Sequence, residues 1–144
     1  MQVFQGGKLV KTFPVSLGKP LTPTSSGNMV IMSREARALW VYGPDGQLEV
    51  KHAERLTADG EYIHGAPWSV DDQGQDNVSN GCTNLSPDSA EWVYNNSRIG
   101  DPVTVTGIND ATVRATRPLA TSVAQPGGAG PAGHLVCSCA VAVR

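Results

Sequence analysis

Short stretches of alternating apolar and polar residues recur along this chain of 144 residues and predict a fold built mainly of β-strands. Residues 2–4 and 8–17 alternate on either side of a Gly-Gly pair, which is typical of a β-hairpin. Glycine, proline and asparagine punctuate the rest of the chain and favour turns between short strands. These strands are expected at 29–32, 39–42, 48–53, 61–64 and 102–107.

One helix is predicted after Ser86. This serine can cap the first turn, Pro87 suits the first helical position, and Asp88 places a negative charge near the helix N-terminus. The pattern therefore predicts a helix that docks by a narrow apolar stripe and ends near Gly100. Three residues share that stripe at i, i+3 and i+4 spacing: Ala90, Val93 and Tyr94.

The composition of the chain changes near residue 110. Residues 110–144 are rich in alanine, glycine, valine, threonine and proline and have no steady hydrophobic period, which indicates a disordered tail. The length of the whole chain suits one domain of ordinary size. We therefore expect a domain at 1–109 and a tail at 110–144.

Charge and hydropathy exclude several classes of function. The net charge of −2 and the 17% of charged residues predict no nucleic-acid partner, since such proteins need a basic surface. No apolar run reaches the roughly 18 residues of a membrane span. Residues 1–8 also lack the charged start and apolar run of a signal peptide, so we expect no export signal in this chain.

The cysteines indicate neither a disulfide framework nor a metal site. There are three, which is an odd number and too few for a network of disulfides. Cys137 and Cys139 lie near His134, but this set has too few ligands at too irregular a spacing for a metal. We predict no metal and no other cofactor.

The remaining cysteine, Cys82, stands in the segment VSNGCTN and is a candidate nucleophile. A cysteine thiol is mostly protonated at neutral pH, so it needs a base. His64 is the best candidate base because it ends a predicted strand and precedes a turn, unlike His52 and His134. The backbone amides around Gly81 can stabilise an oxyanion. From spacing alone, a buried thiol and a surface imidazole remain an open alternative.

Several separated motifs resemble the L,D-transpeptidase catalytic domain (YkuD-like), in particular its mycobacterial and actinobacterial members. They are YIHGAPWS at 62–69, NVSNGCTNLSP at 77–87, GDPV at 100–103, KTFPVSLG at 11–18 and TPT at 22–24. The resemblance covers roughly residues 3–107. It implies a YkuD-like β-sandwich with one short helix after the catalytic cysteine, and an N-terminally truncated catalytic domain at 1–109.

The resemblance also implies a reaction. Cys82 would attack the third residue of a donor tetrapeptide of peptidoglycan and release its terminal D-alanine. The acyl group would pass to the side-chain amine of a diamino acid in a neighbouring stem, which forms a 3-3 cross-link. His64 would serve as base, oriented by the backbone carbonyl of Gly65, and the Gly81 backbone would face the oxyanion.

The implied partners follow from this reaction. Peptidoglycan stem peptides would be the substrates, and β-lactams of the carbapenem class would be covalent inhibitors. The resemblance places the protein in the cell envelope, outside the cytoplasmic membrane, and we expect a monomer. Four residues resemble substrate-binding positions: Tyr62, Trp68, Ser79 and Asn84. For the two aromatic residues, a purely packing role is an equally good interpretation.

One position departs from the family pattern. The family motif reads Ser-His-Gly-Cys, whereas this chain has asparagine at position 80. Asn80 takes the place of an accessory histidine; it can donate a hydrogen bond but cannot carry a proton charge at neutral pH. We therefore expect an altered rate or acceptor preference.

Two other functions remain open. The first is a catalytically impaired cell-wall-binding remnant of the same fold, weakened by Asn80 and by the short N-terminus. The second is a hydrolase with a Cys-His-Asn arrangement in which Asn80 or Asn84 orients the base.

Overall fold

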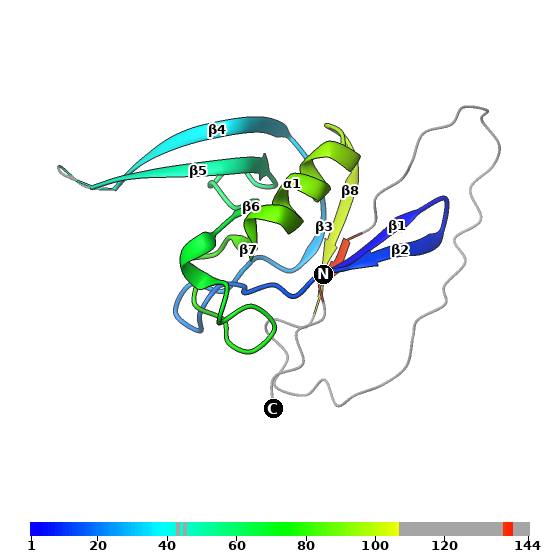
Figure 1. Cartoon of the computed structure of the whole chain (residues 1–144), viewed down its shortest axis with the longest axis horizontal. Coiled ribbons are helices and arrows are strands. Elements are labelled where there is room, and N and C mark those ends of the chain that lie inside the picture. Colours follow the sequence, from blue (N-terminus) through cyan, green and yellow to red (C-terminus); the bar gives the residue numbers. More distant parts are fainter. Residues whose placement is uncertain (43, 45, 107–136, 140–144) are drawn as a thin grey trace.

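The computed structural model describes residues 1–42, 44, 46–106 and 137–139, and its strands far outnumber its helices (Figure 1). The prediction of a mainly β fold with one α-helix after the cysteine is confirmed. Among the described residues, no helix is both long enough and apolar enough to cross a membrane. The elements are β1 (Gln2–Gln5), β2 (Lys8–Thr12), β3 (Gly27–Val30), β4 (Ser33–Tyr42), β5 (Gly46–Arg55), β6 (Tyr62–Gly65), the 3-10 helix η1 (Pro67–Ser69), β7 (Thr83–Leu85), α1 (Pro87–Asn96), β8 (Pro102–Val105) and β9 (Cys137–Cys139).

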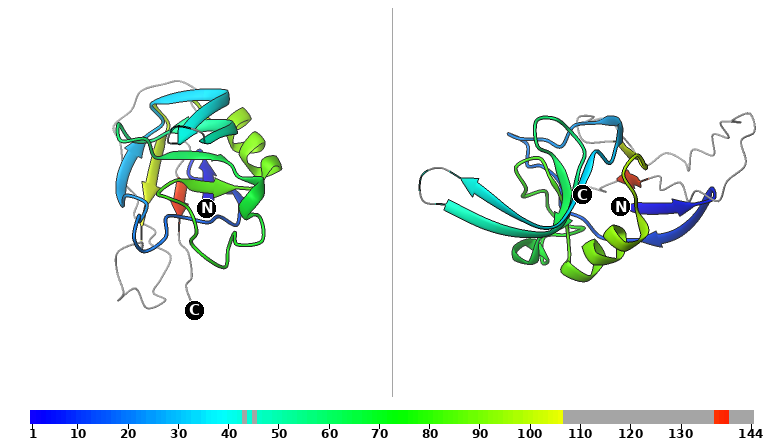
Figure 2. Two further views of the ribbon diagram at one scale, coloured as in Figure 1. Left: turned by 90° about the vertical axis from the view of Figure 1, so that its left-hand side faces the viewer. Right: turned by 90° about the horizontal axis from the view of Figure 1, so that it is seen from above.

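The strands form two sheets, one with the order β2-β1-β9-β8-β3 and one with the order β4-β5-β6-β7. The hairpins β1–β2 and β4–β5 project from the body in opposite directions, and α1 packs on β5 and β6 (Figure 2). Within the predicted tail, β9 pairs with β1 and β8. The rest of that tail, residues 110–136 and 140–144, lies outside the described residues.

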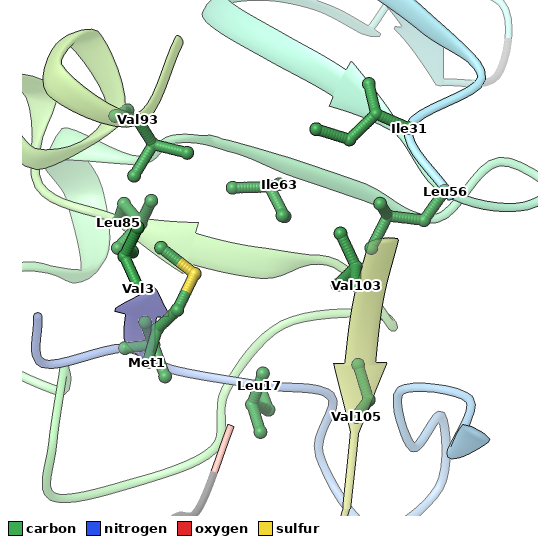
Figure 3. Close-up of a cluster of buried hydrophobic side chains, with 12 residues drawn as sticks. Met1, Val3, Leu17, Ile31, Leu56, Ile63, Leu85, Val93, Val103 and Val105 are labelled. Atoms are coloured by element: carbon green, nitrogen blue, oxygen red, sulfur yellow. The ribbon is translucent and has the colours of Figure 1, made fainter. Parts of the chain in front are cut away.

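The main apolar core joins the sheets to α1 (Figure 3). Ile63 of β6 and Leu85 of β7 are buried in it. Because side chains alternate along a strand, this burial turns His64 and Asn84 toward the opposite face. The core thus decides which face carries the chemistry. Its members are Met1, Val3, Val15, Leu17, Ile31, Leu56, Ile63, Leu85, Ala90, Val93, Val103 and Val105.

Helix α1 begins as the sequence predicts. The Ser86 hydroxyl accepts a hydrogen bond from the Ser89 amide at 3.2 Å, which is the predicted N-cap. Ala90 and Val93 are buried, as expected from the stripe. Tyr94 instead remains partly exposed, because its ring packs under a guanidinium rather than in the core.

The extents of several elements differ from the prediction. The second strand of the N-terminal hairpin ends at Thr12 instead of continuing to residue 17. The stretches expected at 39–42 and 48–53 are parts of two ten-residue strands, β4 and β5. Strand β7 was not predicted, and α1 ends at Asn96, before Gly100. Of these elements, β7 depends on pairing with a distant segment, since it forms against β6.

Strand β5 contains a bulge opposite β6. Lys51 pairs with Gly65 but Glu54 pairs with Ile63, so β5 has one extra residue. His52 lies in this bulge with φ +53°, in the left-handed region. The side-chain alternation of β5 therefore changes phase at this point.

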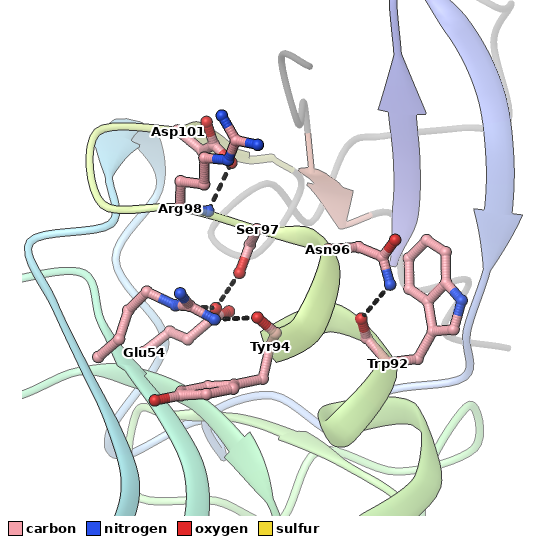
Figure 4. Close-up of polar contacts among 8 residues, drawn as sticks. Glu54, Trp92, Tyr94, Asn96, Ser97, Arg98 and Asp101 are labelled. Carbon is pink, nitrogen blue, oxygen red and sulfur yellow. Dashed lines mark hydrogen bonds and ion pairs between the residues drawn. The ribbon is translucent and has the colours of Figure 1, made fainter. Parts of the chain in front are cut away.

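A buried ion pair ties β5 to the end of α1 (Figure 4). The Glu54 carboxylate is fully buried, accepts a hydrogen bond from the Ser97 hydroxyl, and lies 3.3 Å from Arg34 Nε. The Arg34 guanidinium also donates to the Tyr94 carbonyl and lies 4.0 Å from the centre of the Tyr94 ring. This network anchors the helix that covers β6.

Candidate active site

The predicted nucleophile and base come from neighbouring parallel strands. His64 of β6 lies opposite Asn84 of β7, and Cys82 directly precedes β7. Residues opposite each other in a parallel pair project to the same face, as do residues two apart on one strand. Continued by one residue, this register would place Cys82 opposite Tyr62 and on the face of His64.

The imidazole of His64 is held by the backbone of the next residue. Its Nδ1 lies 3.0 Å from the carbonyl oxygen of Gly65. A carbonyl oxygen only accepts, so Nδ1 carries the proton and Nε2 has the free lone pair. Burial lowers the pKa of His64, opposed in part by the Gly65 hydrogen bond. The ring is therefore a neutral proton acceptor at neutral pH.

The side chain of Cys82 is protonated at neutral pH. Its Sγ lies 4.0 Å from the Gly60 carbonyl oxygen. Burial raises the pKa of Cys82 to about 11; a hydrogen bond with the Tyr62 backbone opposes this rise and the Glu61 carboxylate adds to it. A nucleophilic Cys82 would thus need a base at the moment of attack.

The loop before Cys82 is braced by Ser79. The Ser79 hydroxyl accepts a hydrogen bond from the Gly81 amide at 3.1 Å and donates one to the Cys82 carbonyl at 2.6 Å. Gly81 has φ +123°, which residues with a Cβ rarely adopt. The Gly81 amide, predicted as an oxyanion donor, is thus engaged with Ser79 here. Asn80, at the tip of the turn, is exposed.

Residues 13–19 hold this loop from the side. The Ser79 amide donates to the Leu17 carbonyl at 3.0 Å, and the Lys19 amide donates to the Ser79 carbonyl at 2.9 Å. The Leu17 amide donates to Asn77 Oδ1 at 3.0 Å. The stretch predicted to extend the N-terminal hairpin therefore supports the loop at 77–82, called the nucleophile loop below, instead.

Glu61 belongs to the site, although the sequence analysis did not identify it. Its carboxylate accepts hydrogen bonds from the Ser25 amide at 3.1 Å and the Ser25 hydroxyl at 3.0 Å. A Cβ placed on Gly81 would lie 3.6 Å from Glu61 Oε1, so the carboxylate is in contact distance of the nucleophile loop. A single glutamate before a strand carries no signal that would reveal this position.

Aromatic rings surround His64. Trp68 lies 5.9 Å from the imidazole between ring centres and is half exposed, while Tyr62 precedes His64 on the same face. Trp40, on β4, lies 4.8 Å from the Tyr62 ring and 5.0 Å from the imidazole. Tyr62 and Trp68 were predicted to line the site, whereas Trp40 was not, because nothing local links it to residue 64.

Asn84 is buried beneath this face. Its Nδ2 donates to the Ser69 hydroxyl at 3.1 Å, and its backbone exchanges two hydrogen bonds with Ser16. In this structure Asn84 therefore connects β7 to η1 and to the segment at 13–19 that lies beside the nucleophile loop. Its predicted contact with substrate stays a prediction.

The described residues contain no group of three or more histidine, cysteine or acidic side chains that would hold a metal. His134, weighed above as a weak metal ligand, lies outside the described residues, as do the side chains of Cys137 and Cys139.

Replacing Gly18 with alanine should displace the nucleophile loop. A Cβ at this position would lie 2.1 Å from the Thr22 carbonyl oxygen, and residue 18 forms a bridge with Ser79. We expect a loss of about 1–3 kcal/mol of unfolding free energy, measured in urea, together with slower modification of Cys82 by a thiol reagent. Gly7→Ala, which has φ +76° but open space, separates backbone strain from the steric clash. A smaller loss for Gly18→Ala than for Gly7→Ala would contradict this account.

Comparison with known protein families finds one family over most of the chain. The sequence model of the YkuD family, described as the L,D-transpeptidase catalytic domain, matches residues 1–105. L,D-transpeptidase 1 of Mycobacterium tuberculosis is 43% identical, over 73% of this chain and 45% of that protein.

Solved structures give the same result. The L,D-transpeptidase LdtMt1 in complex with imipenem has a TM-score of 0.67 at 39% identity, over 72% of this chain and 54% of its own. An L,D-transpeptidase from Mycobacterium smegmatis also has a TM-score of 0.67, at 38% identity, over 73% and 54%. The chain spans about half the length of these relatives.

Proposed function

Because the chain belongs to the L,D-transpeptidase catalytic-domain (YkuD) family, we propose that it is a peptidoglycan L,D-transpeptidase that acts through an acyl-enzyme on Cys82. The observation that best supports this proposal is the arrangement of His64. Its Nδ1 lies on the Gly65 carbonyl, so its free Nε2 belongs to a neutral base on the face shared with Cys82. The substrates are stem peptides of the cell envelope, and the enzyme acts as a monomer.

In the first half-reaction, His64 Nε2 takes the thiol proton as Cys82 Sγ attacks the carbonyl carbon of the third stem residue. The oxyanion is stabilised by the Cys82 backbone amide, since the Gly81 amide is engaged by Ser79. The tetrahedral intermediate collapses, the bond to the terminal D-alanine breaks, and His64 gives its proton to the leaving amine. A thioester remains on Cys82.

In the second half-reaction, the side-chain amine of the acceptor stem attacks the thioester carbonyl. His64 accepts a proton from this amine, and the thiolate of Cys82 leaves and takes up that proton. The products are the 3-3 cross-link and the free enzyme.

The surrounding residues take supporting roles. Ser79 fixes the turn that presents Cys82, and Asn84 fixes β7 through Ser69. Tyr62 and Trp68 form apolar walls for the stem peptide, and Asn80 takes the accessory position.

Carbapenem acylation tests the proposal directly. The related structure that contains imipenem supports imipenem as the probe. Incubation of the full chain with imipenem should add one adduct per molecule in the intact mass, and a Cys82→Ala variant should add none. A folded wild-type chain without an adduct would overturn the proposal and favour a binding remnant. Product analysis with and without an acceptor stem separates transfer from hydrolysis.

Replacing Asn80 with histidine should accelerate acylation of Cys82. A protonated histidine is a charged donor where the exposed asparagine amide is neutral, and a hydrogen bond from a charged group is worth about 1 kcal/mol more than one from a neutral group. That free energy corresponds to about fivefold in rate, measured as imipenem acylation in stopped flow. Asn80→Gln, which keeps an amide, is the control and should stay near the wild-type rate. An unchanged or lower rate for Asn80→His would show that asparagine is no handicap.

A further inference from the structure

We propose that Trp40 is a positioning residue for the base: its indole holds the His64 imidazole in the orientation that keeps Nδ1 on the Gly65 carbonyl. This proposal rests on the function proposed above and assigns a role to a residue of the β4–β5 hairpin. The hairpin otherwise projects away from the body of the protein (Figure 1).

Ring contacts carry the proposal. The Trp40 ring meets the imidazole nearly edge to face, at 77° and 5.0 Å between centres. Trp68, tilted by 33°, lies 5.9 Å from the same imidazole, so two indoles contact one catalytic ring. Such aromatic pairs favour defined geometries over free rotation. The Nδ1 hydrogen bond alone leaves the ring free to tilt about one contact, and Trp40 restricts that tilt.

Trp40 is itself held by packing contacts with β5 and β6. Its ring packs at 4.8 Å on Tyr62, and it lies on the small cluster formed by Ala38, Val50 and Ala53. Tyr62 is in turn covered by the Arg55 guanidinium, 5.7 Å from the ring centre. Because of these contacts, the position of β4 determines where the Trp40 ring lies against the His64 imidazole.

Trp40 also limits the access of water to the imidazole. His64 is only 2% exposed, although it lies on the face of the sheet opposite the main core. Burial lowers its pKa, so removal of the indole should move that pKa back toward its ordinary value. The charged and titratable groups near this face are Cys82 and Glu61 at the nucleophile loop, Tyr62 on β6 and Arg55 on β5, whereas Lys51 pairs with Gly65 and projects to the opposite face.

An NMR titration of His64 tests the proposal apart from catalysis. The experiment uses the full chain with Cys82→Ala, and His64→Gln identifies the His64 resonance. Trp40→Ala should raise the titration midpoint of His64 by about half a pH unit or more, while Trp40→Phe should stay close to the parent. Trp92→Ala is the matched control, because Trp92 packs on Phe13 at 5.5 Å, away from this site. It should leave the midpoint unchanged.

The same variants with Cys82 intact should follow that order in imipenem acylation. We expect Trp40→Ala to lose about tenfold in plateau rate and to shift its acid limb upward, with rescue by Trp40→Phe. If Trp40→Ala does not fold, Trp40→Leu replaces it. An unchanged midpoint and acid limb in the folded variant, or an equal shift in Trp92→Ala, would overturn the proposal. If the wild-type chain forms no adduct while Trp40→Ala still shifts the His64 titration, the proposed function alone is refuted.

Discussion

Replacing His64 with glutamine should slow acylation of Cys82 by about 10²- to 10⁴-fold, the usual contribution of a positioned general base. Glutamine keeps a polar side chain of similar size but cannot accept the thiol proton. The expected loss is large because the thiol has a pKa of about 11, so almost none of it ionises unaided at neutral pH. The measurement is the rate of imipenem adduct formation by stopped flow and intact mass.

The pH dependence of the acylation rate shows whether the base removed in His64→Gln is the imidazole of His64. Burial lowers the pKa of His64, so the wild-type rate should rise with pH below about 6.5 and be flat by neutral pH, where the imidazole is already neutral. In His64→Gln this limb should vanish, and the rate should instead rise about tenfold per pH unit toward the thiol pKa. His52→Asn is the matched control, since asparagine tolerates the positive φ of residue 52. A wild-type acid limb that persists in His64→Gln would assign the base elsewhere.

Replacing Glu54 with alanine should cost about 3 kcal/mol of unfolding free energy. The substitution leaves the Arg34 guanidinium, only 22% exposed, without its carboxylate and removes the acceptor of the Ser97 hydroxyl. Urea unfolding at neutral pH measures the loss. The double variant Glu54→Leu, Arg34→Met removes both charges and should recover much of it, whereas Glu54→Leu alone, which fills the space but leaves Arg34 unpaired, should not.

The Glu54 pair also makes a signed prediction about pH. Burial raises the pKa of Glu54 above its ordinary 4.5, with the Ser97 hydrogen bond and Arg34 opposing this rise. Folding therefore favours the protonated form: this contribution is fully present below pH 4.5 and is lost as pH rises through the folded value. Glu54→Gln mimics the protonated form, so its stability should gain on that of wild type between pH 4 and 8. A difference that moves the other way would show that the ion pair outweighs burial.

Local signals predicted some of this structure well. The Ser86 cap and the apolar stripe of Ala90 and Val93 depend only on residues within one or two helical turns, so the start of α1 was predictable. Cys82 and His64 were identified from residue chemistry and from motifs, and the strand register places them on one face. The cap and the stripe are confirmed by the structure, while the roles of Cys82 and His64 stay predictions.

The remaining features depend on partners far along the chain. Strand β7 has three residues, too few for a periodic pattern, and exists because β6 pairs with it. Residues 13–17 alternate as a strand would, but the Val15 and Leu17 carbonyls accept hydrogen bonds from the loop at 74–79, and the Ser16 backbone bonds to Asn84. Trp40 and Glu61 enter the site only through the folded hairpin and the loop around Ser25. No local rule predicts such contacts, since each is decided by tertiary packing.

The bulge at His52 allows β5 to pack on the aromatic rings near His64 and also to anchor the end of α1. Before it, Leu48 and Val50 face the aromatic side; after it, Ala53 faces that side and Glu54 turns toward α1. The bulge thus separates an inner segment at 53–55, which anchors α1 through Glu54, from an outer segment at 46–51, which lies beside the aromatic rings around His64. Insertions or deletions before residue 52, in the outer part of the β4–β5 hairpin, can therefore change the access of solutes to His64 while the core keeps its packing.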